Sequence, residues 1–303
     1  PPAHFLFWQQ GQLTVERYWS PPLSLERRGQ HRVTARAELR EQLSIAVKER
    51  LMSDVPLGAY LSGGVDSSIV VGLMAEALDR PVRTYSIGFD EAAGIHPKFN
   101  KDFHHAKLVA QRFGTDHCPI IMDSSVSLTE LVPRVMIQID EPLANPTALP
   151  TYLIARQAQA DGVKVLLSGD GGDELFGGYT RYMADRWVSR YSCVPATLRQ
   201  HVISPVLRRI SASGAKLADK SELSPTNRYL SWHGIFSPTQ RAALFPGSTI
   251  SDRNVLAEDA FCEAMTARQD GAFQERLMHT DRQTWLAEES NMRMDKSSMW
   301  ASV

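Results

Sequence analysis

The run LSGGVDSS, from Leu61 to Ser68, constrains the fold of this chain more than any other feature. It follows an apolar stretch at 57–61 that predicts a buried strand, and it opens a segment at 67–78 that predicts a helix. Small residues between a strand and a helix let backbone N–H groups approach an anion, and the start of the helix adds partial positive charge. The run lacks the Gly-Lys-Ser/Thr of a Walker loop, so it predicts a phosphate site of another type.

Asp66 stands inside this anion-attracting turn. A carboxylate there would repel a polyphosphate unless it held a cation, which favours a role for Asp66 in binding Mg²⁺. The alternative is a helix-capping aspartate. A Ser/Gly turn alone is often an ordinary connection, so the prediction depends on the complete run in this context.

Composition excludes several classes of protein. At 303 residues and 43% hydrophobic content, the chain can form one large domain or two small ones. A formal net charge of −1 gives no electrostatic case for nucleic acid or membrane partners. Its cysteines, Cys118, Cys193 and Cys262, form no CxxC pair, which disfavours a zinc or iron–sulfur site. No stretch has the roughly 18 apolar residues of a membrane helix and no signal peptide is evident, so we expect a cytoplasmic location.

Predicted strands and helices alternate along the first half of the chain. We expect strands at 57–61, 82–87, 117–122 and 163–167, and helices at 34–53, 67–78, 101–113, 127–139 and 150–160. This alternation predicts an α/β fold with a parallel sheet flanked by helices, followed after Tyr182 by a mostly helical part. Residues 4–8 and 13–19 predict a hairpin, which is marginally stable alone and is expected to pack on something else.

A second Gly-rich turn follows the strand predicted at 163–167. Five glycines and three carboxylates lie between Leu167 and Tyr179. Glycines permit close backbone approach, and carboxylates suit a metal, an amine or a ribose hydroxyl. The alternatives are an acidic turn or a calcium loop, and the spacing of an EF-hand is absent. Because ligands of parallel sheets bind beyond the carboxyl ends of the strands, we expect both turns to form one site.

The strings LSGGVDSS, TYSIGFD, FGTDH, DEPLANPTALPTYLIARQA and LLSGDGGDELFGGY resemble the synthetase domain of glutamine-dependent asparagine synthetases, in that order and spacing. Residues 289–303, with RMDKSSM, resemble a further segment of the family. The resemblance implies an adenine nucleotide alpha hydrolase-like fold of the ATP pyrophosphatase type. It also implies that residues 1–30 are a remnant of an N-terminal glutaminase domain with its linker, and that 31–303 are a C-terminally truncated ATP-binding domain.

The resemblance implies roles for individual residues. One group is expected to hold the pyrophosphate end of ATP: Ser62, Gly63, Gly64, Asp66, Ser67 and Ser68. Another group is expected to line the adenosine pocket or contact the nucleotide: Leu61, Ile87, Ser168 and Gly169. Asp66 and Asp173 would hold Mg²⁺. Asp170 would be catalytic, by binding the incoming amine or assisting proton transfer, both of which a carboxylate can do.

The implied reaction is ATP-dependent amide formation. An aspartate side-chain carboxylate would attack the α-phosphate of ATP and release pyrophosphate, and ammonia would then displace AMP to give asparagine. The expected small-molecule partners are aspartate or a related carboxylate, and ammonia or glutamine, with a homodimer left open. Because no cysteine precedes Cys118, we expect this chain to lack the cysteine nucleophile of the family's glutaminase.

Alternatives stay open at this point. A sister enzyme could adenylate another carboxylate, to form a lactam, a cyclic peptide or a sugar-acid amide, and residues around Asp140 and Asp170 would separate these. A tRNA-thiolating enzyme is disfavoured by the absence of paired cysteines and of a basic balance. The non-enzyme alternative is a nucleotide-binding scaffold. Residues 140–142 are either part of a second-substrate pocket or a turn capping the start of a helix. Lys296 could be a catalytic cation, but a surface or structural lysine is favoured.

Overall fold

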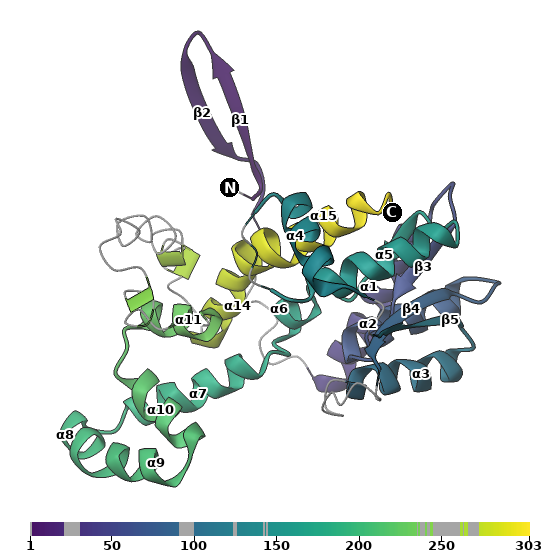
Figure 1. Ribbon diagram of the computed structural model, residues 1–303. Helices are drawn as coiled ribbons and strands as arrows, with labels where there is room; N and C mark the ends of the chain where they lie inside the picture. The colour runs from purple at the N-terminus through teal and green to yellow at the C-terminus, as the bar shows by residue number, and fades with distance from the viewer. Residues whose placement is uncertain are drawn as a thin grey trace. The chain divides into compact units, whose positions relative to one another are not determined.

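The computed structural model describes residues 2–20, 31–90, 100–123, 126–141, 143, 145–234, 236, 240, 243–244, 261–262, 264–265 and 273–303. The chain forms two compact units (Figure 1). The first unit comprises Pro1–Asp170 together with Ser290–Val303, and the second comprises Gly171–Glu289. No helix in the described part of the chain combines the length and apolar character needed to cross a membrane.

Strands and helices alternate in the first unit, as predicted. Its elements are β1 (His4–Gln9), β2 (Gln12–Arg17), α1 (Arg32–Arg50), β3 (Leu57–Tyr60), α2 (Val65–Ala77), β4 (Arg83–Phe89), α3 (Lys101–Phe113), β5 (Asp116–Met122), α4 (Leu128–Ile139), α5 (Ala148–Ala160), β6 (Val165–Leu167) and α15 (Met292–Trp300). The predicted start of α5 at Pro150 is two residues late. Proline is tolerated throughout the first turn of a helix, where its missing N–H needs no partner, so Pro150 did not have to be the first residue.

Four parallel strands form one sheet in the order β5-β4-β3-β6. The chain proceeds from β3 to β4 and β5 on one side, and then returns to place β6 on the other side of β3. The carboxyl ends of β3 and β6 therefore form the topological switch point, where such sheets bind their ligands. This parallel sheet with its flanking helices confirms the predicted fold class.

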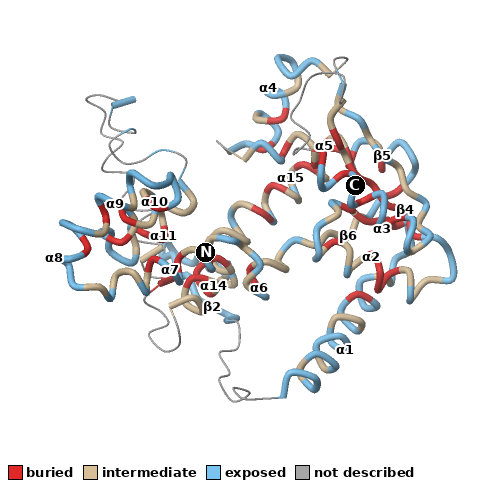
Figure 2. The backbone as a smooth tube through the Cα atoms, turned by 90° about the horizontal axis from the view of Figure 1, so that it is seen from below, coloured by how far each residue is buried: buried red, intermediate tan, exposed pale blue. Residues whose placement is uncertain are grey.

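Helices cover both faces of the sheet (Figure 1). On one face, β3 packs against α1, α2 and α3 through a set of buried residues: Val47, Leu57, Ala59, Leu61, Val71, Met74, Ala106 and Ala110. On the other face, Tyr85 of β4 packs with Ile154 and Ala158 of α5. Figure 2 shows buried residues concentrated where these helices meet the strands. The ring of Trp300 in α15 stacks on Tyr152 of α5, with centroids 3.9 Å apart.

The N-terminal hairpin is confirmed. Strands β1 and β2 pair antiparallel, with His4 opposite Arg17 and Gln9 opposite Gln12. Its large apolar side chains are exposed, with Leu6 and Trp8 each 64% accessible to solvent. That the hairpin packs on something else, and that it is a remnant of another domain, both stay predictions.

The second unit is helical in its described residues, as the sequence after Tyr182 predicts. Its elements are α6 (Gly172–Phe176), α7 (Thr180–Ser192), α8 (Ala196–Leu198), η3 (Arg199–Ile203), α9 (Ser204–Ile210), α10 (Ala212–Ser221), α11 (Pro225–His233) and α14 (Phe273–Gln283). The π-helix η4 (Leu286–Asn291) leads from this unit back to the first.

Asp281 of α14 joins three helices of the second unit. Its fully buried carboxylate accepts hydrogen bonds from the hydroxyls of Tyr182 in α7 and Tyr229 in α11. It also pairs with Arg181 at 2.9 Å and lies 3.0 Å from His233 Nε2. Burial works against ionisation, but the contact with His233 and the other partners outweighs it and holds the pKa of Asp281 below its usual value. The carboxylate is therefore a structural charge.

We expect Asp281→Ala to lower the free energy of unfolding by about 3–5 kcal/mol, because it leaves a buried guanidinium and two buried hydroxyls without their acceptor. Urea unfolding followed by circular dichroism measures the loss. Asp219→Ala is the control, since Asp219 pairs with Arg208 at the surface, where an ion pair contributes about 1 kcal/mol or less. Equal losses in the two variants would contradict a structural role for Asp281.

His117 of β5 lies between two hydroxyl groups of β4. Its Nδ1 is 3.0 Å from Thr84 Oγ1, and its Nε2 is 3.1 Å from Ser86 Oγ. Burial lowers the pKa of His117 below 6.5, and the charges of Lys107 and Arg83 lower it further. The folded sheet therefore favours the neutral imidazole.

Because the pKa of His117 is lower in the folded protein, the unfolded chain takes up a proton first as the pH falls. The stabilisation is fully present above about pH 6.5 and is lost as the pH falls toward the folded pKa. Urea unfolding between about pH 7.5 and pH 5.5 should show a steeper loss of stability in the native protein than in His117→Gln. Parallel pH profiles for the two proteins would count against this assignment.

Candidate active site

The loop between β3 and α2 is shaped by its own serines. The hydroxyls of Ser62 and Ser67 share a hydrogen bond at 2.9 Å, and Ser62 Oγ accepts the N–H of Gly64 at 3.2 Å. The hydroxyl of Ser68 donates to the carbonyl oxygen of Gly64 at 2.6 Å. Every serine of the predicted phosphate site therefore takes part in closing the loop before any ligand is bound.

Gly63 holds the loop against α3. Its φ is 82°, and a Cβ at this position would collide with the carbonyl oxygen of Asp102. Only glycine fits both requirements. The loop enters α2 at Gly64 without a side-chain cap, so the start of this helix offers N–H groups and a positive dipole end to an anion. Asp66 lies in the first turn of the same helix.

The loop after β6 lies directly against the loop after β3. Strand β6 pairs with β3 in parallel, with Ala59 opposite Leu167, so the two chains leave the sheet next to each other. A Cβ on Gly169 would lie 2.5 Å from the backbone nitrogen of Ser67. The N–H of Asp170 donates to Ser168 Oγ at 3.3 Å. Within the first unit, the structure thus brings the start of the second Gly-rich turn, residues 168–170, against the first turn.

The side chains of Leu61 and Ile87 differ in how far they are buried. The side chain of Leu61 is fully buried in the core, and its N–H donates to the carbonyl oxygen of Tyr85 at 2.8 Å. Leu61 can therefore meet a nucleotide only through its backbone. Ile87 is half-buried on β4 and packs with the cluster that faces α5. Their adenosine-binding roles stay predictions.

Asp173 belongs to the second unit, in the first turn of α6. Its carbonyl oxygen accepts the N–H of Gly177 at 2.8 Å. Among the described residues there is no group of three or more His, Cys, Asp or Glu side chains suited to a metal. Mg²⁺ is commonly held by one or two carboxylates plus substrate phosphates, so a site at Asp66 and Asp173 would need phosphate oxygens as further ligands. That assignment stays a prediction.

The position of Asp140 rules out one of the two interpretations of residues 140–142, a turn that caps the start of a helix. It ends α4 as the C-cap, in the left-handed conformation with φ of 58°, so the turn does not cap the start of a helix. Aspartate is one of the few residues that adopt this conformation readily. Glu141 pairs with Lys296 of α15 at 3.2 Å, which agrees with a structural Lys296, and Pro142 lies outside the described residues. A second-substrate role for this turn stays a prediction.

Three residues that no sequence pattern pointed to, Ser290, Arg293 and Tyr60, surround Asp170. Ser290 Oγ donates to Asp170 Oδ1 at 2.8 Å, and Arg293 Nη2 lies 3.9 Å from the same oxygen. The hydroxyl of Tyr60, at the end of β3, is buried without a hydrogen-bond partner. Burial first, and the charge of Asp170 second, raise the pKa of Tyr60. The family-like segment at 289–303 was the available signal, but nothing in it indicates which distant residue it meets.

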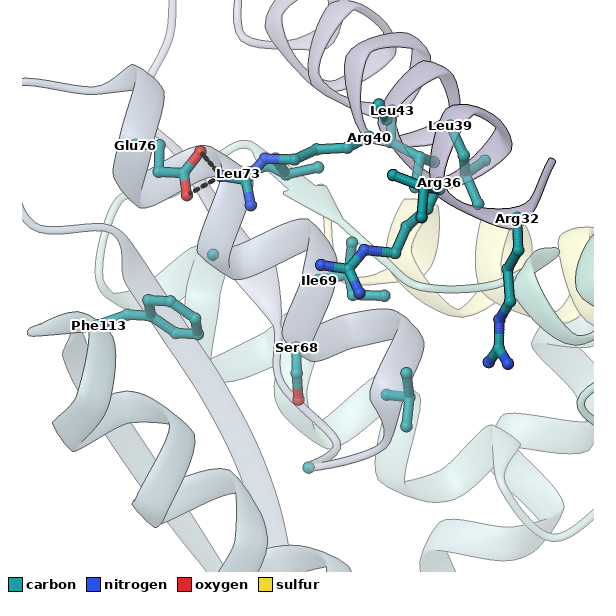
Figure 3. Close-up of a pocket in the computed structure, with 15 residues that line it drawn as sticks. Arg32, Arg36, Leu39, Arg40, Leu43, Ser68, Ile69, Leu73, Glu76 and Phe113 are labelled. Carbon is teal, nitrogen blue, oxygen red and sulfur yellow. Dashed lines mark hydrogen bonds and ion pairs between the residues drawn. The ribbon is translucent and has the colours of Figure 1, made fainter.

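An open groove of about 1020 Å³ borders the loop after β3 (Figure 3). Arg32, Arg36 and Arg40 line it from α1, and Ile69 and other apolar residues line it from α2. Arg40 pairs with Glu76 across the groove at 2.9 Å. Of the described residues that line this groove, none comes from the loop after β6. The groove is therefore next to the candidate site but is not formed by both of its loops.

Comparison with protein families matches residues 38–303 to the model described as asparagine synthase. The chain is 25% identical over 304 residues to glutamine-hydrolyzing asparagine synthetase 1 of Bacillus subtilis, covering 100% of this chain and 46% of that protein. It is 30% identical over 274 residues to a putative glutamine-hydrolyzing asparagine synthetase of Mycobacterium tuberculosis, covering 88% and 39%.

Another similar protein is amidase chyE of Penicillium rubens, 26% identical over 296 residues, covering 88% of this chain and 42% of the relative. The chain therefore spans less than half the length of these relatives. Among solved structures, NMN synthetase from Francisella tularensis is 13% identical, with a TM-score of 0.37 over 85% of this chain and 95% of that one.

The contact between the two loops can be tested at Gly169. We expect Gly169→Ala to lower the free energy of unfolding by about 1–3 kcal/mol, because the new methyl group meets the backbone of Ser67. Gly234→Ala is the control, since its added Cβ would make ordinary contacts, with 3.4 Å to the nearest atom. A Gly169→Ala protein as stable as the control would show that the loops do not touch.

Proposed function

The chain belongs to the asparagine synthase family, and on that premise we propose that it carries the ATP site of an amide ligase that forms AMP and pyrophosphate. One observation supports this most: the uncapped start of α2 and the carboxylate of Asp170 come from two loops that touch at the switch point of the sheet. An anion site thus lies beside a potential acid–base group. That is the pairing needed to activate a carboxylate with ATP and then attack it with an amine.

In the proposed reaction, an oxygen of the acceptor carboxylate bonds to the α-phosphorus of ATP, and the bond from that phosphorus to the bridging oxygen breaks. Pyrophosphate leaves, and its growing negative charge is stabilised by the N–H groups and dipole at the start of α2. When bound, Mg²⁺ would supply further charge neutralisation on the phosphates, with Asp66 and Asp173 as its protein ligands.

Ammonia then completes the reaction. Its nitrogen bonds to the acyl carbon, one proton leaves that nitrogen, and AMP departs with the electrons of the acyl–oxygen bond. We assign the role of proton acceptor to Asp170. With aspartate as the acceptor the product is asparagine, and this is the substrate that we propose first because of the names of the relatives in the family.

The experiment measures pyrophosphate and AMP release from Mg·ATP by the full-length protein, with and without aspartate and ammonium. Aspartate-dependent release with formation of asparagine would support the proposal. Activity with another carboxylate but not with aspartate would keep the chemistry and change the substrate. Release of ADP and phosphate would contradict it, and nucleotide binding without release would favour a scaffold.

We expect Asp66→Asn to reduce pyrophosphate release by at least about 100-fold, because a neutral amide neutralises less of the metal's charge and binds it less well. Weaker nucleotide binding should be evident only in the presence of Mg²⁺. Asp79→Asn is the matched control, since Asp79 is an exposed aspartate beyond the other end of α2. Full adenylation activity in Asp66→Asn would exclude the metal assignment.

A further inference from the structure

The carboxylate of Asp170 is held through one of its two oxygens. Oδ1 accepts the hydroxyl of Ser290 at 2.8 Å and lies 3.9 Å from Arg293 Nη2. Among the described residues, these are the side-chain contacts of this carboxylate, and both are to Oδ1. The side chain of Asp170 remains 29% exposed. One oxygen is therefore anchored, while Oδ2 remains available to a substrate.

Ser290 and Arg293, which contact Asp170, are themselves held by further contacts. Arg293 is buried, and its Nη1 donates to Thr151 Oγ1 of α5 at 3.3 Å. Its Nη2 lies 3.4 Å from Ser290 Oγ. Ser290 and Arg293 are three residues apart where η4 continues into α15, so they share one side of the helix. A chain of polar contacts thus runs from α5 through Arg293 and Ser290 to Asp170.

One positively charged side chain lies beside this carboxylate. Arg293 from α15 and Tyr60 from β3 are the titratable groups that the described structure places beside Asp170. The hydroxyl of Tyr60 is buried and keeps its proton, so Arg293 supplies the positive charge. A hydroxyl donor and a guanidinium both complement the oxygens of a carboxylate.

We propose that Ser290 and Arg293 are positioning residues for Asp170. Ser290 binds Oδ1, Arg293 holds Ser290 and lies near the same oxygen, and Oδ2 is left to accept the proton of the attacking amine. This inference rests on the proposed function. As the nitrogen–carbon bond forms, the nitrogen becomes positively charged, one N–H proton moves to Oδ2, and AMP leaves with the electrons of the acyl–oxygen bond.

The principal test is Ser290→Ala in the full-length protein. We expect kcat for amide formation to fall about 10- to 100-fold, because the carboxylate loses a charge-assisted hydrogen bond. The KM for ATP should stay within about 2-fold, since Ser290 does not contact the nucleotide loop in the proposed arrangement.

Ser290→Thr and Ser297→Ala complete the series. The threonine keeps the hydroxyl and should restore most of the rate. Ser297 lies in the same segment, and its buried hydroxyl has no hydrogen-bond partner, so Ser297→Ala should match the native protein. Urea unfolding of each variant separates a loss of rate from a loss of folded protein. A kcat of Ser290→Ala within about 2-fold of the native value would overturn the proposal.

A second measurement does not depend on the reaction. The carboxyl ¹³C NMR signal of Asp170, measured at one pH, should shift in Ser290→Ala relative to the native protein, because Oδ1 loses its hydroxyl donor. An unchanged signal would overturn the positioning role even if the enzyme is a ligase. A shifted signal in a protein that adenylates no carboxylate would instead retain the positioning contacts and refute the proposed function.

Discussion

The close approach of two backbone segments at the carboxyl ends of β3 and β6 is the constraint on which the candidate site depends. Gly169 leaves no room for a side chain beside Ser67, and the pairing of β6 with β3 places both loops at one edge of the sheet. This contact sets Asp170 next to the start of α2. If the loops separated, the uncapped helix start and the carboxylate could no longer serve one substrate in the proposed reaction.

The sequence predicted well how strands and helices follow one another along the chain, because the alternating apolar segments and the two Gly-rich turns are local signals. It could not predict the order of the strands within the sheet, since periodicity does not show which strands pair. The whole of the second unit lies between Asp170 and Ser290 in sequence, and no local pattern indicates such a pair. The sequence left two interpretations of residues 140–142 open, because an acidic residue near Pro142 suits either end of a helix, and the backbone conformation of Asp140 removes the helix-start interpretation.

Two carboxylates show how the same group can be structural or available for chemistry. Both oxygens of Asp281 have partners: Tyr229 and His233 on Oδ1, and Tyr182 and Arg181 on Oδ2. No oxygen of Asp281 is left for a ligand, so its hydrogen bonds and ion pairs serve only to hold the helices together. The carboxylate of Asp170 differs, because its side-chain contacts among the described residues are all on Oδ1 and Oδ2 remains available to a substrate.

The first unit is interrupted in sequence, because its last helix, α15, follows the whole of the second unit. During synthesis, the sheet and its first helices emerge early, but Trp300 reaches its stacking partner Tyr152 only after Gly171–Glu289 have been made. At about 5–20 residues per second, that delay is on the order of 10 s. Throughout this interval the surface of α5 that α15 later covers stays open. A chaperone that shields this surface on the ribosome would therefore act before the second unit is complete.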